Sequence, residues 1–279
     1  MKPSADIPHL RIVPTEKLHP HELPDEQRAQ PLVSRLRRDR VLKNPPIVLP
    51  IEARDEYVVL DGANRVTALR LLGSPHSLVQ VAHPNGDSVE VRTWNHVLMG
   101  LESAKAKSLL LRSETETKTN TMRTDQHSGD GAEKGFLRIH FADGEQSIFP
   151  GGERTLQERI KLLNEVVDTY RDDVHFERTS GDNLDGVREM YDSVAALVVF
   201  PEFDPEEVVE AASKNWHFPP GITRFIVSPR ALRLNYPLAM LDGAEPVEEK
   251  QEHLNTWVRS RVRNRRVRFY AESTFLFDE

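Results

Sequence analysis

The residues of this chain best suited to chemistry follow an apolar run, Tyr57–Leu60, as the segment Asp61–Arg65. The run is typical of a buried strand, and apolar residues recur at helical spacing beyond it, with Gly73 placed to end the helix. The sequence therefore predicts a strand, a tight turn and a helix. The first amides of a helix lack acceptors within it, and the helix dipole favours negative charge there, so this turn could hold a phosphate group.

Two side chains at the turn carry charge. Asp61 could orient a substrate hydroxyl or bind a metal ion, and Arg65, at the helix start, could reach a phosphate oxygen. The alternative is an ordinary strand-to-helix connection in which Asp61 only caps the helix. Because Asp-Gly turns are common, the turn taken alone favours that alternative.

Other segments stand in a recognisable order with this turn. Residues 13–22 read V-P-T-E-K-L-H-P-H-E, a helical stretch follows to about Arg40, and residues 41–49 read V-L-K-N-P-P-I-V-L. With the D-G-x-x-R of the turn, this order resembles the ParB/sulfiredoxin fold, and more narrowly its free L-serine kinases, which include archaeal ADP-dependent enzymes and serine kinases of siderophore clusters. Further blocks similar to these kinases lie at residues 93–95, 221–230, 235–238 and 268–279.

The resemblance implies an α+β protein with a ParB/sulfiredoxin-like N-terminal core. Residues 1–111 are expected to form the nucleotide-binding catalytic domain, and residues 136–279 an α/β domain that packs against it and contributes to the substrate site. Residues 112–135 between them have too little apolar content to pack, which predicts a polar loop or linker.

The resemblance also implies a small-molecule kinase. The expected reaction transfers phosphate from ADP or ATP to the hydroxyl of free L-serine or a related hydroxy amino acid. Magnesium is implied, because nucleotide phosphates need charge neutralisation during transfer, and Asp61 is the expected metal ligand. Neither ADP nor ATP is favoured as donor by the sequence.

Two carboxylates are the expected catalytic residues, Glu22 and Asp61. In the kinases a glutamate at the place of Glu22 acts as general base on the substrate hydroxyl. A serine hydroxyl is a poor nucleophile at neutral pH, so a carboxylate that accepts its proton late in transfer is chemically reasonable. By itself, Glu22 would be read as a solvated loop carboxylate.

The expected nucleotide-binding residues are Lys43, Asn44, Gly62, Ala63, Asn64, Arg65 and Val66. Lys43 could neutralise a phosphate and Asn44 could bond to nucleotide or substrate, from a loop stiffened by two prolines, although such a lysine is more often a surface charge. The kinases commonly carry two histidines where this chain has Ala63 and Asn64. Asn64 can donate one hydrogen bond in place of a histidine, whereas Ala63 offers only its amide.

Four residues are expected to bind substrate. Trp94 matches a tryptophan that helps to bind the amino acid, and Arg224 matches an arginine that contacts its carboxylate or phosphate, a role suited to a bidentate donor. Phe225 stands where the kinases usually have histidine, which removes a polar contact and leaves threonine or another hydroxy amino acid open as acceptor. Arg230 is a family-like position, with a surface cation at a helix start as the alternative.

Periodicity predicts further elements. A hairpin is expected with strands at 136–141 and 146–149, helices over 156–170 and 205–214, and strands at 195–200 and 225–227. Residues 95–111 are expected to be helical. A long charged helix is expected over 245–267, with inward-facing residues Leu254, Trp257, Val258 and Val262.

The composition limits the classes of function. A net charge of −7 over 279 residues argues against general nucleic-acid binding. The absence of cysteine excludes disulfides, thiolate metal sites and the cysteine chemistry of sulfiredoxin. The N-terminus does not resemble a signal peptide and apolar runs are too short to span a bilayer, so a cytoplasmic protein without membrane partners is expected.

The alternative function is a ParB-like, nucleotide-dependent DNA-binding or regulatory protein. It would need a helix-turn-helix module after the core and a basic face, and the acidic, polar central region offers neither. The expected partners are therefore a nucleotide and a free hydroxy amino acid, and a homodimer is the assembly considered.

Overall fold

The computed structural model describes residues 7–23, 26–51, 54–82, 88–111, 120–123, 136–150 and 152–270. Contacts divide the chain into two compact units: unit 1 contains residues 1–19, 24–89 and 227–279, and unit 2 contains residues 20–23 and 90–226. This division differs from the sequential domains expected from the sequence, because the C-terminal segment returns to unit 1. Four early residues, Glu22 among them, belong to unit 2.

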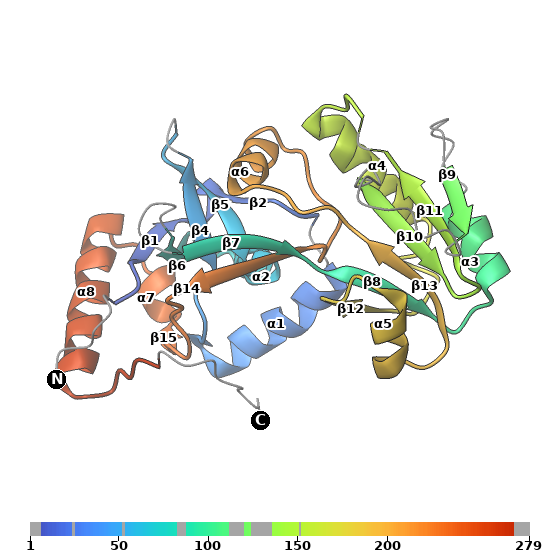
Figure 1. Ribbon diagram of the computed structural model, residues 1–279. Coiled ribbons are helices and arrows are strands. Elements are labelled where there is room, and N and C mark those ends of the chain that lie inside the picture. The colour runs from blue at the N-terminus through green and yellow to red at the C-terminus, as the bar shows by residue number, and fades with distance from the viewer. Residues whose placement is uncertain are drawn as a thin grey trace. The chain divides into compact units, whose positions relative to one another are not determined.

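Unit 1 is built on a five-stranded mixed sheet (Figure 1). Across the sheet the strands are β1 (Leu10–Pro14), β6 (His76–Val81), β4 (Ile47–Ile51), β5 (Glu56–Asp61) and β2 (Leu18–Pro20). β4 runs parallel to β6 and antiparallel to β5, so the carboxyl end of β5 carries Asp61 beside the start of β4. A core cluster that includes Val48, Val59 and Val79 anchors these strands.

The helices of unit 1 are α1 (Glu26–Asp39), α2 (Ala63–Leu71), α7 (Ala239–Asp242) and α8 (Val247–Arg263), with the short helix η1 at Thr15–Lys17. α1 packs on α2, and α8 lies along β1 (Figure 1). The prediction for α8 was right for Leu254, which is fully buried, and for Trp257 and Val258, which pack on the core. It was wrong for Val262, which is 39% exposed because it lies in the last helical turn, beyond the core.

Unit 2 contains a six-stranded sheet in which all neighbouring strands are antiparallel. Across it the strands are β12 (Phe176–Thr179), β8 (Asn95–Met99), β13 (Val194–Val199), β10 (Leu137–Phe141), β11 (Glu145–Phe149) and β9 (Asn120–Arg123). The predicted hairpin is confirmed as β10 and β11. β9 lies within the stretch expected to be a loop, and the rest of that stretch lies outside the described residues.

The helices described in unit 2 are α3 (Ser103–Leu110), α4 (Leu156–Asp168), α5 (Leu184–Met190) and α6 (Pro205–Ser213). The prediction of a helix over residues 95–111 was wrong in its first part, because 95–99 form β8. Val97 and Leu98 are fully buried there between two flanking strands, so the segment lacks the alternation that marks a half-buried strand. The predicted α4 and α6 are confirmed, and each begins with a capping box.

Two short sheets complete the fold: β14 (Thr223–Ser228) with β7 (Ser88–Thr93), and β15 (Tyr236–Pro237) with β3 (Val41–Leu42). The chain passes from one unit to the other within β7 and again within β14. Within the described ranges, every helix is too short or too polar to cross a lipid bilayer.

Candidate active site

The predicted strand, turn and helix at Asp61 are confirmed in unit 1. β5 ends at Asp61, Gly62 is the N-cap of α2, and the helix follows from Ala63. Gly62 has φ +94°, a backbone conformation that favours glycine, and a Cβ built there would lie 2.7 Å from Nε of Arg65. Asp61 precedes the N-cap, and its side chain contacts Arg65 and Arg230.

The first turn of α2 is suited to an anion. It contains no acidic residue, and its leading amides, those of Ala63, Asn64 and Arg65, have no acceptor within the helix. The positive end of the helix dipole adds to this preference. The N-terminus of α2 is therefore a place where a phosphate group could bind.

Asp61 carries two arginine partners. Its Oδ2 accepts a hydrogen bond from Arg230, and its Oδ1 lies 3.3 Å from Nη2 of Arg65. Burial lowers the pKa of the Arg65 guanidinium, and the neighbouring Asp61 carboxylate opposes that effect. Two guanidinium groups against one carboxylate leave a positive local balance, which favours an incoming phosphate. Arg230 lies between β14 and β15, not at the start of a helix as the alternative assumed.

Other residues expected around the nucleotide differ in what they contact. The Asn44 carbonyl accepts a hydrogen bond of 3.4 Å from Arg65, so Asn44 supports the arginine. Lys43 is 54% exposed, and its Nζ lies 3.4 Å from Oδ2 of Asp39. Val66 is a correction: its side chain is fully buried and its amide donates to the Gly62 carbonyl, so neither group is open to a nucleotide.

Glu22 lies in unit 2, where its carboxylate accepts three hydrogen bonds. The donors are the amide of Gly221 at 2.9 Å, the amide of Thr223 at 3.3 Å and the Thr223 hydroxyl. Gly221 has φ +77°, a left-handed backbone conformation that favours glycine. We call Glu22, His21, Gly221 and Thr223 the carboxylate niche.

His21 completes the carboxylate niche. It is buried, and its Nε2 lies 2.6 Å from Oγ1 of Thr223 and 3.5 Å from Oε1 of Glu22. Burial alone would raise the pKa of Glu22, but the contacts with His21, Thr223 and Gly221 together lower it below its ordinary value. With only 16% of its side chain exposed, Glu22 is an ionised, largely buried carboxylate, and the alternative of a solvated loop carboxylate was wrong.

The expected substrate residues Trp94 and Arg224 meet in unit 2. The guanidinium carbon of Arg224 lies 4.5 Å from the centroid of the Trp94 ring, a cation–π contact, and both residues are partly buried. Phe225 is buried, with its ring edge-on to His21 at 5.0 Å between centroids. Phe225 therefore packs against His21 of the carboxylate niche.

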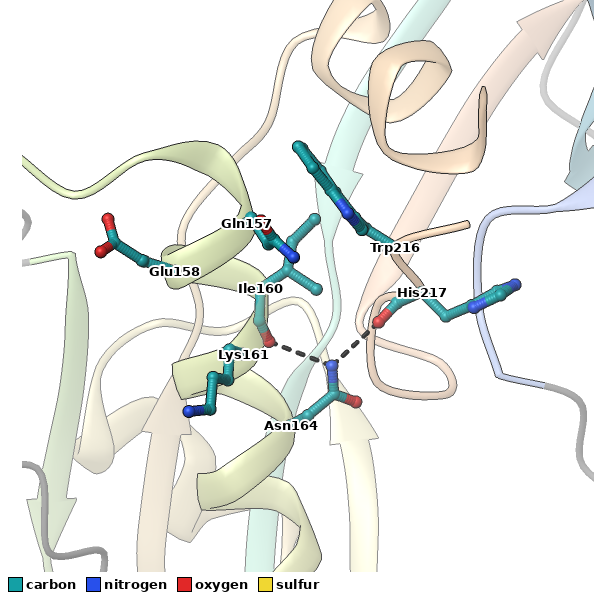
Figure 2. A pocket seen from close by; sticks show the side chains of 7 residues that line it. All are labelled: Gln157, Glu158, Ile160, Lys161, Asn164, Trp216 and His217. Carbon is teal, nitrogen blue, oxygen red and sulfur yellow. Dashed lines mark hydrogen bonds between the residues drawn. The ribbon is translucent and has the colours of Figure 1, made fainter. Parts of the chain in front are cut away.

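A separate surface hollow of about 270 Å³ lies in unit 2 (Figure 2). Its lining residues are Gln157, Glu158, Ile160, Lys161, Asn164, Trp216 and His217. Nδ2 of Asn164 donates to the carbonyls of Ile160 and His217, which fixes α4 to the segment after α6. The residues predicted from the sequence to form the site do not line this hollow.

Two groups of residues therefore carry the candidate chemistry, one in each unit. Unit 1 holds Lys43, Asn44, Asp61, the start of α2 and Arg230, whereas unit 2 holds Glu22, Trp94, Arg224 and Phe225. Sequence reasoning missed His21, Gly221 and Thr223 as partners of Glu22. Two of them lie 199 and 201 residues away along the chain, and the signal that could have found them is the block at 221–225. Among the described residues, no three His, Asp or Glu side chains gather to hold a metal ion.

Comparisons with known proteins identify relatives along the whole chain. The chain is 26% identical over 277 residues to the ATP-dependent L-serine kinase SbnI of Staphylococcus aureus, covering 97% of this chain and 98% of that protein. It is 24% identical to an ATP-dependent L-serine kinase of Staphylothermus marinus, over 86% of this chain and 95% of that one. The ADP-dependent L-serine kinase SerK of Thermococcus kodakarensis is 22% identical, over 59% and 67% respectively.

Solved structures share the fold. A C-terminally truncated SbnI from Staphylococcus aureus superposes with a TM-score of 0.72 at 23% identity, over 91% of this chain and 97% of that one. A free serine kinase variant in complex with AMP gives a TM-score of 0.65 at 18% identity, over 86% and 98%. No family model matches the chain. In motif order, in relatives along nearly its full length and in fold, this chain is similar to free L-serine kinases.

Proposed function

We propose that this protein phosphorylates the side-chain hydroxyl of free L-serine, or of a closely related hydroxy amino acid, with ATP or ADP as donor. The observation that carries the proposal is the buried, ionised Glu22 in its carboxylate niche. Two amides and the Thr223 hydroxyl fix the carboxylate, and His21 lies 3.5 Å from its Oε1. The relatives reported above are kinases, which gives the DNA-binding alternative no support.

Glu22 is the proposed proton acceptor. The substrate oxygen attacks the terminal phosphorus of the nucleotide, the bond from that phosphorus to the leaving diphosphate or monophosphate nucleotide breaks, and the hydroxyl proton passes to Glu22. A carboxylate with a lowered pKa is a weak base, which suits a loose transition state in which the proton moves late. Such assistance typically contributes on the order of 10²–10⁴-fold in rate.

The start of α2 is the proposed seat of the nucleotide phosphates. Its leading amides and Arg65 supply hydrogen bonds and positive charge, and Asn44 holds Arg65 through its carbonyl. Lys43 is exposed and paired with Asp39, so its part is to add positive charge near the turn. Relatives named for ATP and for ADP leave both donors in the proposal.

Magnesium fits this turn as an ion held chiefly by the nucleotide. Mg²⁺ commonly keeps several waters and binds through one or two carboxylates and the substrate phosphates. Asp61 offers one such carboxylate, and its arginine partners could turn to phosphate oxygens when a nucleotide binds. When bound, the ion would neutralise charge on the transferring phosphoryl group.

Trp94 and Arg224 are the proposed amino-acid contacts. The guanidinium is held on the indole face, which leaves its planar N–H groups available for a carboxylate. Phe225 acts indirectly, since its ring contacts His21 in the niche. The acceptor is therefore tuned by how the niche is packed, and Phe225→His should shift the preference among hydroxy amino acids. Kinase relatives and the substrates themselves favour a cytoplasmic reaction.

The test is a matrix of free amino acids and donors. Serine, threonine and homoserine are each incubated with ATP or ADP and magnesium, and products are followed by phosphorus NMR. We expect a phosphomonoester signal from at least one pair, absent without enzyme and strongly reduced with Glu22→Gln. A wild-type enzyme that forms no phosphorylated amino acid from any pair would refute the proposal.

A further inference from the structure

Gln80 is a buried polar residue with no part in the proposed reaction so far, and it pairs with Ile47 of β4, the strand that lies between it and Asp61. It lies on β6 and is 1% exposed. Its Nε2 donates to the Pro229 carbonyl at 2.8 Å, and its Oε1 accepts from the Ala231 amide at 2.8 Å. These two hydrogen bonds hold the main chain on either side of Arg230.

The segment held by Gln80 is irregular, and at its far end the Asn235 amide donates to the Lys43 carbonyl at 3.3 Å. Residues 229–235, between β14 and β15, form no helix or strand, and the Arg230 side chain is 37% exposed. A second hold comes farther along, where the Arg233 amide donates to Oδ1 of Asn44 at 2.8 Å. A loop without a ladder of its own takes its position from such side-chain contacts, because its amides and carbonyls need partners.

The amide of Gln80 suits this place because it presents one donor and one acceptor on the same planar group. Both atoms are engaged with main chain, so the contact fixes backbone position independently of the side chain at 230. Arg230 in turn bonds Asp61 at the end of β5, in the same unit.

We propose that Gln80 is a positioning residue that sets Arg230 against Asp61 for phosphoryl transfer. The inference rests on the proposed function, in which Asp61 and Arg230 serve the nucleotide and its substrate. Gln80 touches neither; it acts through the main chain at residues 229–231.

Unit 1 contains a matched control. Gln251 on α8 makes the same kind of two-sided contact, accepting from the Ile12 amide at 2.8 Å and donating to the Leu10 carbonyl at 3.3 Å. The residue it brackets, Arg11, has no part in the proposed reaction. Gln80→Met and Gln251→Met therefore remove similar hydrogen bonds from the same unit, one beside Arg230 and one away from it.

The experiment is a double-mutant cycle. Gln80→Met and Gln251→Met are made in the wild type and in Arg230→Ala, and kcat/KM is measured with the donor and acceptor found in the product screen. Displacement of a catalytic group by about 1 Å can cost on the order of 100-fold, so Gln80→Met should lower kcat/KM by about 10- to 100-fold. In the Arg230→Ala background, Gln80→Met should change kcat/KM by less than about twofold, because the arginine that Gln80 positions is already absent.

Hydrogen exchange gives a readout that needs no turnover. Amides in the segment 229–235 should exchange faster in Gln80→Met and stay unchanged in Gln251→Met. If Gln80→Met fails to fold, Gln80→Glu keeps the acceptor for Ala231 and loses the donor to Pro229 except when protonated; its activity relative to wild type should rise as pH falls.

The outcomes separate the two proposals. A wild type without activity refutes the kinase, whereas the exchange arm still decides whether Gln80 holds the segment. An active wild type in which Gln80→Met costs the same with and without Arg230, or no more than Gln251→Met, shows that Gln80 only stabilises the fold. Unchanged exchange in 229–235 would refute the positioning role in either case.

Discussion

Asp61 and Glu22 are carboxylates in two different settings. Asp61 is 37% exposed and shared by two guanidinium groups, whereas Glu22 is 16% exposed and held mainly by two amides and a hydroxyl. Cations around Asp61 balance its charge and are themselves available to phosphate. The donors around Glu22 fix its position, with His21 beside it at 3.5 Å. In the proposed mechanism, this difference in partners separates a carboxylate that serves binding from one that accepts the proton.

Replacing Glu22 should give the largest effect. Glu22→Gln cannot accept a proton, so kcat should fall on the order of 10²–10⁴-fold while nucleotide and amino-acid binding persist. The change also sets an amide NH₂ group against hydrogen-bond donors, so thermal unfolding must be measured beside turnover and calorimetry.

Glu202→Gln is the matched control in the same unit. Its carboxylate is 61% exposed and pairs with Arg92, outside the carboxylate niche. We expect near-normal kcat from this variant. Near-normal kcat from a folded Glu22→Gln enzyme would instead show that positioning and charge alone carry the transfer, and the contrast between the two carboxylates would lose its mechanistic meaning.

Replacing Asp61 should give the next largest effect, and of a different kind. Asp61→Asn keeps the shape of the side chain but removes the charge that holds Arg65 and Arg230. Loss of a charged hydrogen bond is worth about 1.5–3 kcal/mol, so turnover should fall about 10- to 100-fold. The affinity for ADP without magnesium should increase because both arginines are released, which titration calorimetry can measure.

Asp55→Asn provides the corresponding control in unit 1. Asp55 pairs with Lys17 and is 71% exposed, in the turn before β5. Its replacement should leave turnover and ADP affinity unchanged. If Asp61→Asn behaves like this control in both measurements, Asp61 is a surface ion pair and leaves the proposed site.

The two carboxylates also differ in how far sequence could predict their surroundings. The Asp61 turn is local: strand, glycine and helix lie within consecutive residues, and Arg65 is four positions away, so pattern and spacing suffice. The carboxylate niche joins residues about 200 positions apart, and a single sequence contains no physical signal for that register. Resemblance alone placed Glu22 in the site.

The wrong predictions of secondary structure and of single residues also arose because the deciding contacts lie far away along the chain. Residues 95–99 were predicted as helix because a strand buried on both faces does not alternate, and only its place between β12 and β13 explains the pattern. Val66 has the spacing of a helical core residue, and its full burial decides against a nucleotide contact. Gln80 was missed because its role depends on a segment about 150 residues later.

A smaller effect is expected from the pair Trp94 and Arg224. Trp94→Ala and Arg224→Ala should each raise the KM for the amino acid more than they change nucleotide affinity, because both are proposed to hold the acceptor. A cation–π contact is worth about 0.5–2 kcal/mol, so the double variant should lose less than the sum of the two single losses. Steady-state kinetics on the cycle measures the coupling.

Trp216 offers a comparison within unit 2, since Lys214 lies 4.6 Å from the centroid of its ring. Trp216→Ala removes a similar contact beside the surface hollow and should leave the KM for the amino acid unchanged. Equal effects from Trp94→Ala and Trp216→Ala would mean that the tryptophans only support the fold.

The smallest expected effect is on the free energy of unfolding at acid pH, and it tests whether the carboxylate niche favours the ionised form of Glu22. The folded state lowers the pKa of Glu22 below its ordinary value of 4.5, so the unfolded chain binds the proton more readily. The stability that the carboxylate contributes is therefore fully present above pH 4.5 and is lost as pH falls through the lower, folded-state pKa. The free energy of unfolding, measured by urea denaturation from pH 7 to 3, should fall more steeply below pH 4.5 for wild type than for Glu22→Gln. Exposed carboxylates are common to both proteins and cancel in this difference, so parallel curves would show that the carboxylate niche does not favour the ionised form of Glu22.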